Sequence, residues 1–355
     1  MKQLVFVLLL VTEASPRSNC TLWKLGCDCP RDYKFTICSR LDLTQLPGRV
    51  PTSTELLDFS GNLISVVPKN IFSANRKLRV LLLQNNNISV MEDGCFAQLE
   101  FLQKLDLSWN RISSLTEGFS VGLAFLRELQ LSHNQLSSLD SRSFFHLDGL
   151  QRLNLTNNRV QSIQMRSFST MSSLRQLHLR NNQLASLRGG TFSMLRSLEI
   201  LSLAGNQISK IEMVVFSPLT SMTLLNLADN RLSTVSFKTF LSIHTYSTHI
   251  LLQGNPWNCD CELHRVFRKL RSIQRLFLDD YSNLTCMEPP VLREHLLTDV
   301  DSELCIAETV TVLIITITVV ITVLATMLMG ERKKKKRRKG LHWTQQGEFS
   351  DVSDF

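Results

Sequence analysis

Asparagine recurs along the middle of this 355-residue chain at a nearly fixed interval. Seven intervals of 24 residues and a last one of 25 separate nine asparagines: Asn62, Asn86, Asn110, Asn134, Asn158, Asn182, Asn206, Asn230 and Asn255. The segment LQKLDLSWNRI (102–112) and three later segments follow the pattern L-x-x-L-x-L-x-x-N-x-L, with Ile or Val also found at the last position. A repeat of this period predicts a solenoid, in which each unit contacts only its neighbours.

The pattern is that of a leucine-rich-repeat array, with nine units over residues 53–255. We therefore expect an α/β fold whose L-x-L segments are short parallel strands, lined up in a curved sheet with their leucines in a shared core. Each repeated Asn has an amide that can donate and accept, which predicts a ladder of hydrogen bonds to the backbone.

A phenylalanine fills the core from the convex side in most repeats. It stands ten residues after the asparagine at Phe72, Phe96, Phe144, Phe168, Phe192, Phe216 and Phe240. In the third repeat Phe119 comes one position early, which predicts a local adjustment of the backbone there.

Cysteines flank the repeats where a solenoid needs caps over its exposed core. An N-terminal cap (20–52) and a C-terminal cap (256–306) hold four each: Cys20, Cys27, Cys29 and Cys38, then Cys259, Cys261, Cys286 and Cys305. Four cysteines allow three disulfide pairings, and zinc is the alternative for C-x-C. Disulfides fit a secreted chain better than zinc does. The ninth cysteine, Cys95, is expected to be a small buried core residue, with a covalent partner as the less favoured alternative.

Both ends of the chain indicate passage through a membrane. Lys2, the apolar residues 4–11 and a small residue at Ala14 predict a signal peptide over residues 1–14, with Ser15 and Ser18 as alternative cleavage positions. Residues 310–329 contain no charge, Pro or Gly. As a helix they would extend about 30 Å, the thickness of a bilayer core, so they predict a transmembrane helix.

The helix is followed by the basic run, defined here as Arg332, Lys333, Lys334, Lys335, Lys336, Arg337, Arg338 and Lys339. The formal net charge of the chain is +8, so the run alone accounts for it. A basic run after an apolar span is typical of a stop-transfer signal with a cytoplasmic tail (330–355). Nuclear targeting is the alternative, and nucleic acid is not an expected partner. We expect a single-pass type I protein of the plasma membrane whose run contacts anionic inner-leaflet lipids.

Two shorter patterns suggest contacts of the membrane helix and the tail. Thr311, Thr318, Thr322, Ala325 and Thr326 fall on one side of the helix, where their hydroxyls bond either another helix or their own backbone. Ser353 and Phe355 end the chain in the arrangement that PDZ domains accept, which predicts a PDZ protein as a candidate partner.

The concave face of the sheet is the expected binding surface. Its candidate residues are Leu82, Lys104, Asp106, Glu128, Arg152, His178, Arg180 and Leu224. Predicted glycosylation sequons begin at Asn19, Asn87, Asn154 and Asn283, and a glycan on Asn154 would obstruct the centre of this face. Catalytic motifs are not found, and His133, His178 and His249 have no partner at useful spacing in the sequence. We therefore predict no catalytic, cofactor or metal residues.

The signal peptide, cysteine-flanked repeats, the NPWNCDC segment and a single span together resemble the extracellular leucine-rich-repeat membrane proteins. Layouts of this kind occur in auxiliary subunits of potassium channels and in trophoblast-glycoprotein-like receptors. The resemblance implies the disulfides Cys20–Cys29, Cys27–Cys38, Cys259–Cys286 and Cys261–Cys305. It implies a non-catalytic receptor or adhesion protein that binds an extracellular protein. The alternative is an auxiliary channel subunit that acts through the transmembrane helix and the basic run.

Overall fold

The computed structural model describes residues 20–30, 34–300 and 302–346. The chain forms two units, residues 1–298 and 299–355, which are described separately. The predicted signal peptide, the sequon at Asn19 and the PDZ-like terminus (Ser353 and Phe355) lie outside the described residues. Their assignments remain predictions.

One parallel sheet of eleven strands runs through the first unit. Nine strands come from the nine predicted repeats, and each cap adds one more, which sequence reasoning did not anticipate. In sheet order the strands are β1 (Phe35–Ile37), β2 (Leu56–Asp58), β4 (Val80–Leu82), β6 (Lys104–Asp106), β7 (Glu128–Gln130), β9 (Arg152–Asn154), β11 (Gln176–His178), β13 (Ile200–Ser202), β15 (Leu224–Asn226), β16 (Thr248–Leu251) and β18 (Leu276–Leu278). The predicted leucine-rich-repeat solenoid is confirmed.

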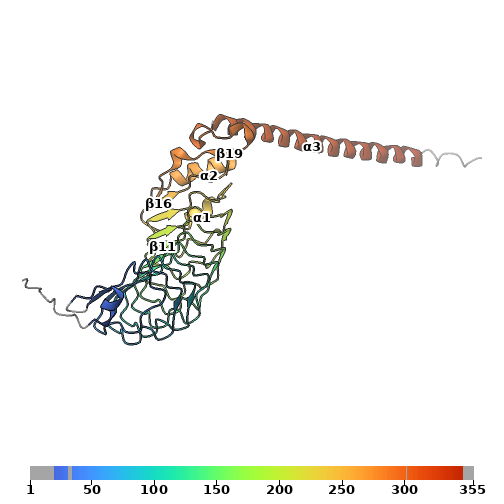
Figure 1. Cartoon of the computed structure of the whole chain (residues 1–355). Coiled ribbons are helices and arrows are strands. Elements are labelled where there is room, and N and C mark those ends of the chain that lie inside the picture. Colours follow the sequence, from blue (N-terminus) through green and yellow to red (C-terminus); the bar gives the residue numbers. More distant parts are fainter. Residues whose placement is uncertain (1–19, 31–33, 301, 347–355) are drawn as a thin grey trace, which may run out of the picture. The chain divides into compact units, whose positions relative to one another are not determined.

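The register of the sheet follows the repeat. Leu105 of β6 pairs with Leu81 and Leu129, its counterparts one repeat away on either side. These central leucines are fully buried, whereas the residues before and after them face outward and are half-exposed. Figure 1 shows β11 and β16 on one side of the solenoid and the short helices α1 (Phe237–Leu241) and α2 (Cys261–Arg271) on the other.

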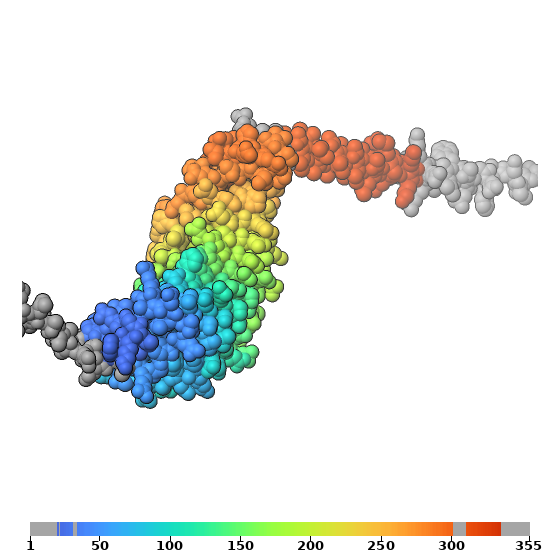
Figure 2. Space-filling model, viewed as in Figure 1, coloured from blue at the N-terminus to red at the C-terminus, as the bar shows by residue number. Residues whose placement is uncertain are grey.

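The buried asparagines tie each turn to the one before it. The Asn110 side-chain amide donates to the carbonyls of Leu83 (2.9 Å) and Leu107 (3.0 Å), and its oxygen accepts from the N–H of Ile88 (2.9 Å). The other ladder asparagines repeat these bonds, for example Asn206 with Leu179. The predicted double role of the amide is therefore confirmed. Turn by turn, the chain stacks in sequence order, as the colours of Figure 2 show.

Short second strands line the convex side in pairs. They are β3 (Val66–Val67) with β5 (Val90–Met91), β8 (Ser138–Leu139) with β10 (Ser162–Ile163), and β12 (Ser186–Leu187) with β14 (Lys210–Ile211). The third repeat forms no such strand at residues 114–115. Its Phe119 ring meets Phe96 edge-on at 88°, whereas Phe72 and Phe96 stack at 13°. The early phenylalanine thus produces the local adjustment that the sequence predicts.

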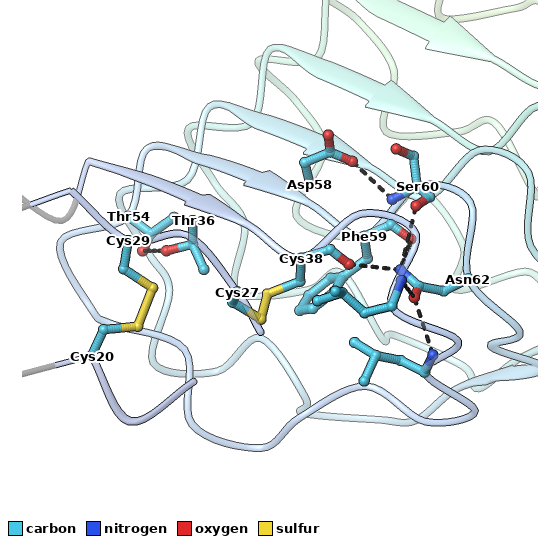
Figure 3. The surroundings of a disulfide bond; sticks show 12 residues. Cys20, Cys27, Cys29, Thr36, Cys38, Thr54, Asp58, Phe59, Ser60 and Asn62 are labelled. Carbon is cyan, nitrogen blue, oxygen red and sulfur yellow. Dashed lines mark hydrogen bonds between the residues drawn. A yellow bond between two sulfur atoms is a disulfide. The ribbon is translucent and has the colours of Figure 1, made fainter. Parts of the chain in front are cut away.

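The N-terminal cap covers the first repeat with a short 3-10 turn, η1 (Thr21–Leu25), and two disulfides, Cys20–Cys29 and Cys27–Cys38. Figure 3 shows how Asn62 joins this cap to the array, since its amide donates to the carbonyl of Cys38 at 2.8 Å. Both disulfides join the cysteines that the family resemblance pairs.

The C-terminal cap is built around Trp257, which is fully buried and meets Phe267 of α2 edge-on at 5.4 Å. Asp260 caps α2 by accepting from the N–H of Leu263. The remaining cap elements are β17 (Trp257–Asn258), η2 (Tyr281–Asn283), β19 (Cys286–Glu288), η3 (Pro290–Leu292) and η4 (Leu297–Asp299).

Two disulfides serve this cap. Cys259 is bonded to Cys286, the pair that the resemblance implies. Cys261 is also disulfide-bonded. Its expected partner, Cys305, lies outside the residues whose side chains are described.

The second unit is one helix, α3 (Ser302–Gln346). Its stretch Val310–Lys334 is long and apolar enough to cross a membrane, and none of it is buried in protein. The hydroxyls of Thr318, Thr322 and Thr326 donate to carbonyls three residues earlier at 2.8 Å. Of the two roles considered for these threonines, the structure shows the bond to their own helix.

Candidate functional site

All eight predicted binding residues lie on the outward face of the main sheet, which is the side turned away from the buried leucines. The strands from β4 to β15 turn their first and third residues outward, so Leu82, Lys104, Asp106, Glu128, Arg152, His178 and Leu224 lie on that face, half-exposed or exposed. Arg180 follows two residues after His178 and is exposed. The structure thus places them on one continuous surface, and their role in binding stays a prediction.

Charges alternate at the centre of this face. The Glu128 carboxylate lies 2.8 Å from the Lys104 Nζ atom and 2.6 Å from an Arg152 guanidinium nitrogen, across adjacent strands. Partial burial raises the pKa of Glu128, but hydrogen bonds from Lys104 and Arg152 lower it more, and the result is a pKa of about 2. The carboxylate therefore stays charged, and both cations are paired.

His178 stands beside this charged centre, with Asn154 and Ser202 opposite it on the neighbouring strands. Burial lowers the pKa of His178 below its ordinary value, because a charged imidazole is poorly solvated there. The ring is therefore neutral at pH 7 and offers one donor and one acceptor to a partner.

Aromatic and amide side chains form a row along the edge of the face. Each member of this row directly precedes one of the ladder asparagines. The rings of Trp109 and His133 stack at 3.6 Å, and His133 Nε2 is 2.9 Å from the Asn157 amide nitrogen. The Asn181 amide in turn donates to Asn157 at 2.8 Å. These partners of His133 are not evident at close spacing in the sequence, because the repeat brings residues 24 apart into contact.

Apolar side chains occupy both ends of the face. The N-terminal apolar patch consists of Phe35, Ile37, Leu56, Val80 and Leu82 on β1, β2 and β4, where Phe35 is 44% and Ile37 39% exposed. Asp58 lies at its border, between Ile37 and Leu82. Sequence reasoning singled out Leu82 in this patch. It missed Phe35 and Ile37 because the cap strand β1 carries no L-x-L signal.

The C-terminal end of the face has a second apolar group around Leu224 and Phe277, the latter 43% exposed. His249 stacks on Phe277 with 5.1 Å between ring centres, and its Nδ1 lies 2.9 Å from an oxygen of Asp279. The sequence shows no partner for His249 at close spacing, because Phe277 lies on β18 and Asp279 directly follows it. Sequence reasoning did not place β18 in the sheet.

The predicted glycosylation positions differ in their surroundings. Asn154 is half-buried on β9, where its side-chain oxygen accepts from the N–H of Thr156 at 3.0 Å. Asn87 is half-buried in the loop before β5, and Asn283 is exposed in η2. Glycan attachment at these sequons stays a prediction.

The described residues contain no group of His, Cys, Asp and Glu side chains that could hold a metal ion. Cys95 is buried and unpaired, and burial raises the pKa of its thiol to about 12. A thiol this weakly acidic is not a nucleophile at neutral pH.

A family model described as leucine rich repeat matches residues 52–112, 124–184 and 172–232. A solved structure of human 5T4 (Wnt-activated inhibitory factor 1, trophoblast glycoprotein) is similar, with 25% identity and a TM-score of 0.60. The match covers 82% of this chain and 99% of that chain. No curated protein matches the sequence.

Two further structures are similar. One is an octameric complex of Latrophilin 3, Unc5D and the leucine-rich-repeat part of FLRT2, with 25% identity, a TM-score of 0.58, and coverage of 78% of this chain and 97% of that chain. The other is a TLR13–ssRNA13 complex, with 22% identity, a TM-score of 0.54, and coverage of 75% and 41%. The latter likeness shows the fold alone.

Proposed function

We propose that this chain, a leucine-rich-repeat protein with a cysteine cap at each end, is a non-catalytic cell-surface receptor or adhesion protein. It binds an extracellular protein through the outward face of its sheet. The observation that carries the proposal is the N-terminal apolar patch, in which Phe35 and Ile37 stay substantially exposed at the end of a continuous sheet.

The patch has the composition of an interface core. Contiguous exposed apolar surface is uncommon on soluble proteins and marks sites of interaction. Aromatic side chains such as Phe35 anchor protein interfaces, and polar side chains around them exclude water and set specificity. The charged centre at Lys104, Glu128 and Arg152 adjoins the patch along the sheet and supplies such a polar border.

The comparisons support a protein as the partner. The FLRT2 structure contains leucine-rich repeats in a complex with two other proteins, Latrophilin 3 and Unc5D. This chain covers nearly the whole of that repeat unit at 25% identity.

The proposed placement is a single-pass type I protein of the plasma membrane. The predicted signal peptide (1–14) and the apolar part of α3 support it. The basic run begins directly after the span, and its first three members, Arg332, Lys333 and Lys334, are exposed on α3. Cations just after a span favour the cytoplasmic side, where they attract anionic lipids.

The patch predicts a clear result in affinity capture from native membranes. We expect the full chain in nanodiscs to recover an extracellular protein that Phe35→Ser combined with Ile37→Ser no longer recovers. The matched control is Phe101→Ser with Phe125→Ser, a stacked pair 56% and 62% exposed off the outward row of the sheet. Equal capture by the two double variants would contradict the proposal.

Channel regulation has weaker support. It would act through the span, where Thr318, Thr322 and Thr326 lie on one side of the helix. Deleting residues 53–255 while keeping the span separates the functions, because a regulator acting through the span would keep its effect.

A further inference from the structure

Two hollows on the convex side of the solenoid each coincide with a missing second strand. One small cavity of about 180 Å³ lies beside residues 114–115. A larger one of about 710 Å³ lies where β14 has no following strand to pair with and helix α1 replaces it. The larger cavity, here called the convex hollow, is formed between β14, α1 and α2.

Cations surround the convex hollow. Lys210 comes from β14, Lys238 from α1, and Arg265 and Lys269 from α2, whereas Glu262 is the sole acidic residue among its lining residues. Four cations and one carboxylate leave a formal charge of +3. All five side chains are exposed.

These cations are not neutralised within the protein. In the described part of the chain none of the four forms an ion pair with a carboxylate. Lys269 lies 5.8 Å above the Phe237 ring, which orients its ammonium group without cancelling the charge. Packing thus holds β14, α1 and α2 together, although the cations that they carry repel one another.

The floor and rim suit an anionic ligand with oxygen acceptors. Leu232, Val235 and Phe237 form an apolar floor, and Ser209, Thr234 and Ser236 add hydroxyl donors. Ser236 precedes α1 but makes no side-chain bond to its first turn, so its hydroxyl is available. The volume lies within the range of roughly 300–1,000 Å³ that is usual for ligand pockets.

The exposure of the cations decides between a small anion and a polymer. A single exposed ion pair contributes about 0–1 kcal/mol, so one small anion would be held weakly. A chain with repeated charges engages several cations at once and releases its counterions, which makes binding strong at low salt. The convex hollow therefore fits part of a polyanion.

The cellular compartment of the repeats indicates which class of polyanion the convex hollow can meet. Disulfides in both caps indicate an oxidising environment outside the cytosol. Anionic lipids concentrate in the cytoplasmic leaflet, on the other side of the membrane. Sulfate esters remain charged at all physiological pH values, and sulfated polysaccharides are the polyanions of cell surfaces. We propose that the convex hollow binds a sulfated polysaccharide chain, opposite the protein-binding face. This inference rests on the proposed extracellular placement of the repeats.

The test uses the full chain in phosphatidylcholine nanodiscs with Arg332–Lys339 replaced by serine, so that the basic run cannot bind the probe. The probes are heparin, fully desulfated heparin and single-stranded DNA at about 0.15 M salt. The hollow variant combines Lys238→Gln, Arg265→Gln and Lys269→Gln. The matched control combines Lys77→Gln, Arg188→Gln and Arg196→Gln, three exposed cations on other turns.

We expect heparin to bind and its Kd to rise roughly ten- to a hundredfold in the hollow variant, with a smaller salt dependence. The control variant should change Kd less than twofold, and desulfated heparin should not bind. Equal weakening by both variants, or equal binding of DNA and heparin, would overturn the proposal. Intact cells given external heparin test the placement separately. Binding by nanodiscs but not by cells would leave the site standing and refute the extracellular orientation.

Discussion

The centre of the sheet and the convex hollow both hold cations, but the two regions differ in whether these cations are paired with a carboxylate. On the sheet, Lys104 and Arg152 share one carboxylate, Glu128, and both are paired. Around the convex hollow, Lys210, Lys238, Arg265 and Lys269 have no such partner among the described residues. Paired charges fix local structure, whereas unpaired ones keep their full attraction for an external anion. The two regions should therefore respond differently to substitution.

Cys259→Ser should give the largest difference in response between the convex hollow and the sheet centre. It removes the disulfide to Cys286 just before α2, which carries Arg265 and Lys269. Loss of such a bond costs about 2–5 kcal/mol. We expect hydrogen exchange to quicken in residues 261–271 while strands β6, β7 and β9 stay protected.

Its control is Cys95→Ala, which removes a buried thiol without breaking a disulfide. That variant should leave exchange in α2 unchanged. Equal loss of protection in α2 and the sheet centre would show that the regions are not separable.

Asn134→Ala should weaken the sheet centre and spare the convex hollow. It removes donors to the carbonyls of Leu107 and Leu131 and an acceptor for the N–H of Ile112, all buried. We expect the free energy of unfolding in urea to fall by about 1–3 kcal/mol. Gln135→Ala, at the half-exposed amide that follows Asn134 in the chain, should cost at most about 0.5 kcal/mol. A comparable loss in both variants would contradict the ladder's role.

Glu128→Gln tests the ion pairs of Glu128 through the dependence of stability on pH. The folded pKa of about 2 lies below the ordinary 4.5. The carboxylate therefore contributes stability that is present above pH 4.5 and lost as pH falls towards 2. Because the ion pairs are partly exposed, we expect the wild type to exceed the variant by only about 1 kcal/mol at pH 7. Thermal unfolding across pH 2–7 should show the difference closing below pH 4.5.

Glu117→Gln is the matched control, since Glu117 forms an exposed ion pair with Arg142. This variant should show no such closing of the stability difference at low pH.

Glu128→Gln also leaves Lys104 and Arg152 unpaired, so it should create weak heparin binding on the sheet. Absence of that gain would show that unpaired cations alone do not suffice.

The smallest expected effect is that of the hollow variant on stability. Lys238, Arg265 and Lys269 are exposed and make no ion pair with any described residue, so replacing them with glutamine should change the free energy of unfolding by no more than about 0.5 kcal/mol. Slight stabilisation is expected, because like charges are removed. Destabilisation by more than 1 kcal/mol would mean that the cations serve the fold.

The periodic parts of this structure could be predicted from the sequence because their contacts repeat every 24 residues. The nine strands, the ladder from Asn62 to Asn255 and the core phenylalanines all follow that period. The cap strand β1 was missed because its inward residue is Thr36, which bonds Thr54 at 3.0 Å in place of a buried leucine. No periodic signal marks such a pair.

The convex hollow escaped prediction for a related reason. Lys210, Lys238 and Lys269 belong to a repeat, to a helix that interrupts the repeats, and to a cap helix. Their proximity depends on α1 packing against α2. The position of β18 in the sheet likewise cannot be predicted from a repeat motif. The exposed Phe277 and the His249–Asp279 pair depend on it.

The strict pairing of each strand with the one before it has a consequence for synthesis. The partner of every new strand of the main sheet has already left the ribosome, since it lies about 24 residues earlier for most strands. The contact order is therefore low for so large a sheet, and turns can be added one at a time on the finished N-terminal cap. During this growth the newest strand always presents an open edge that invites aggregation. Growth of the sheet ends at β18, which pairs with β16 and forms the last edge.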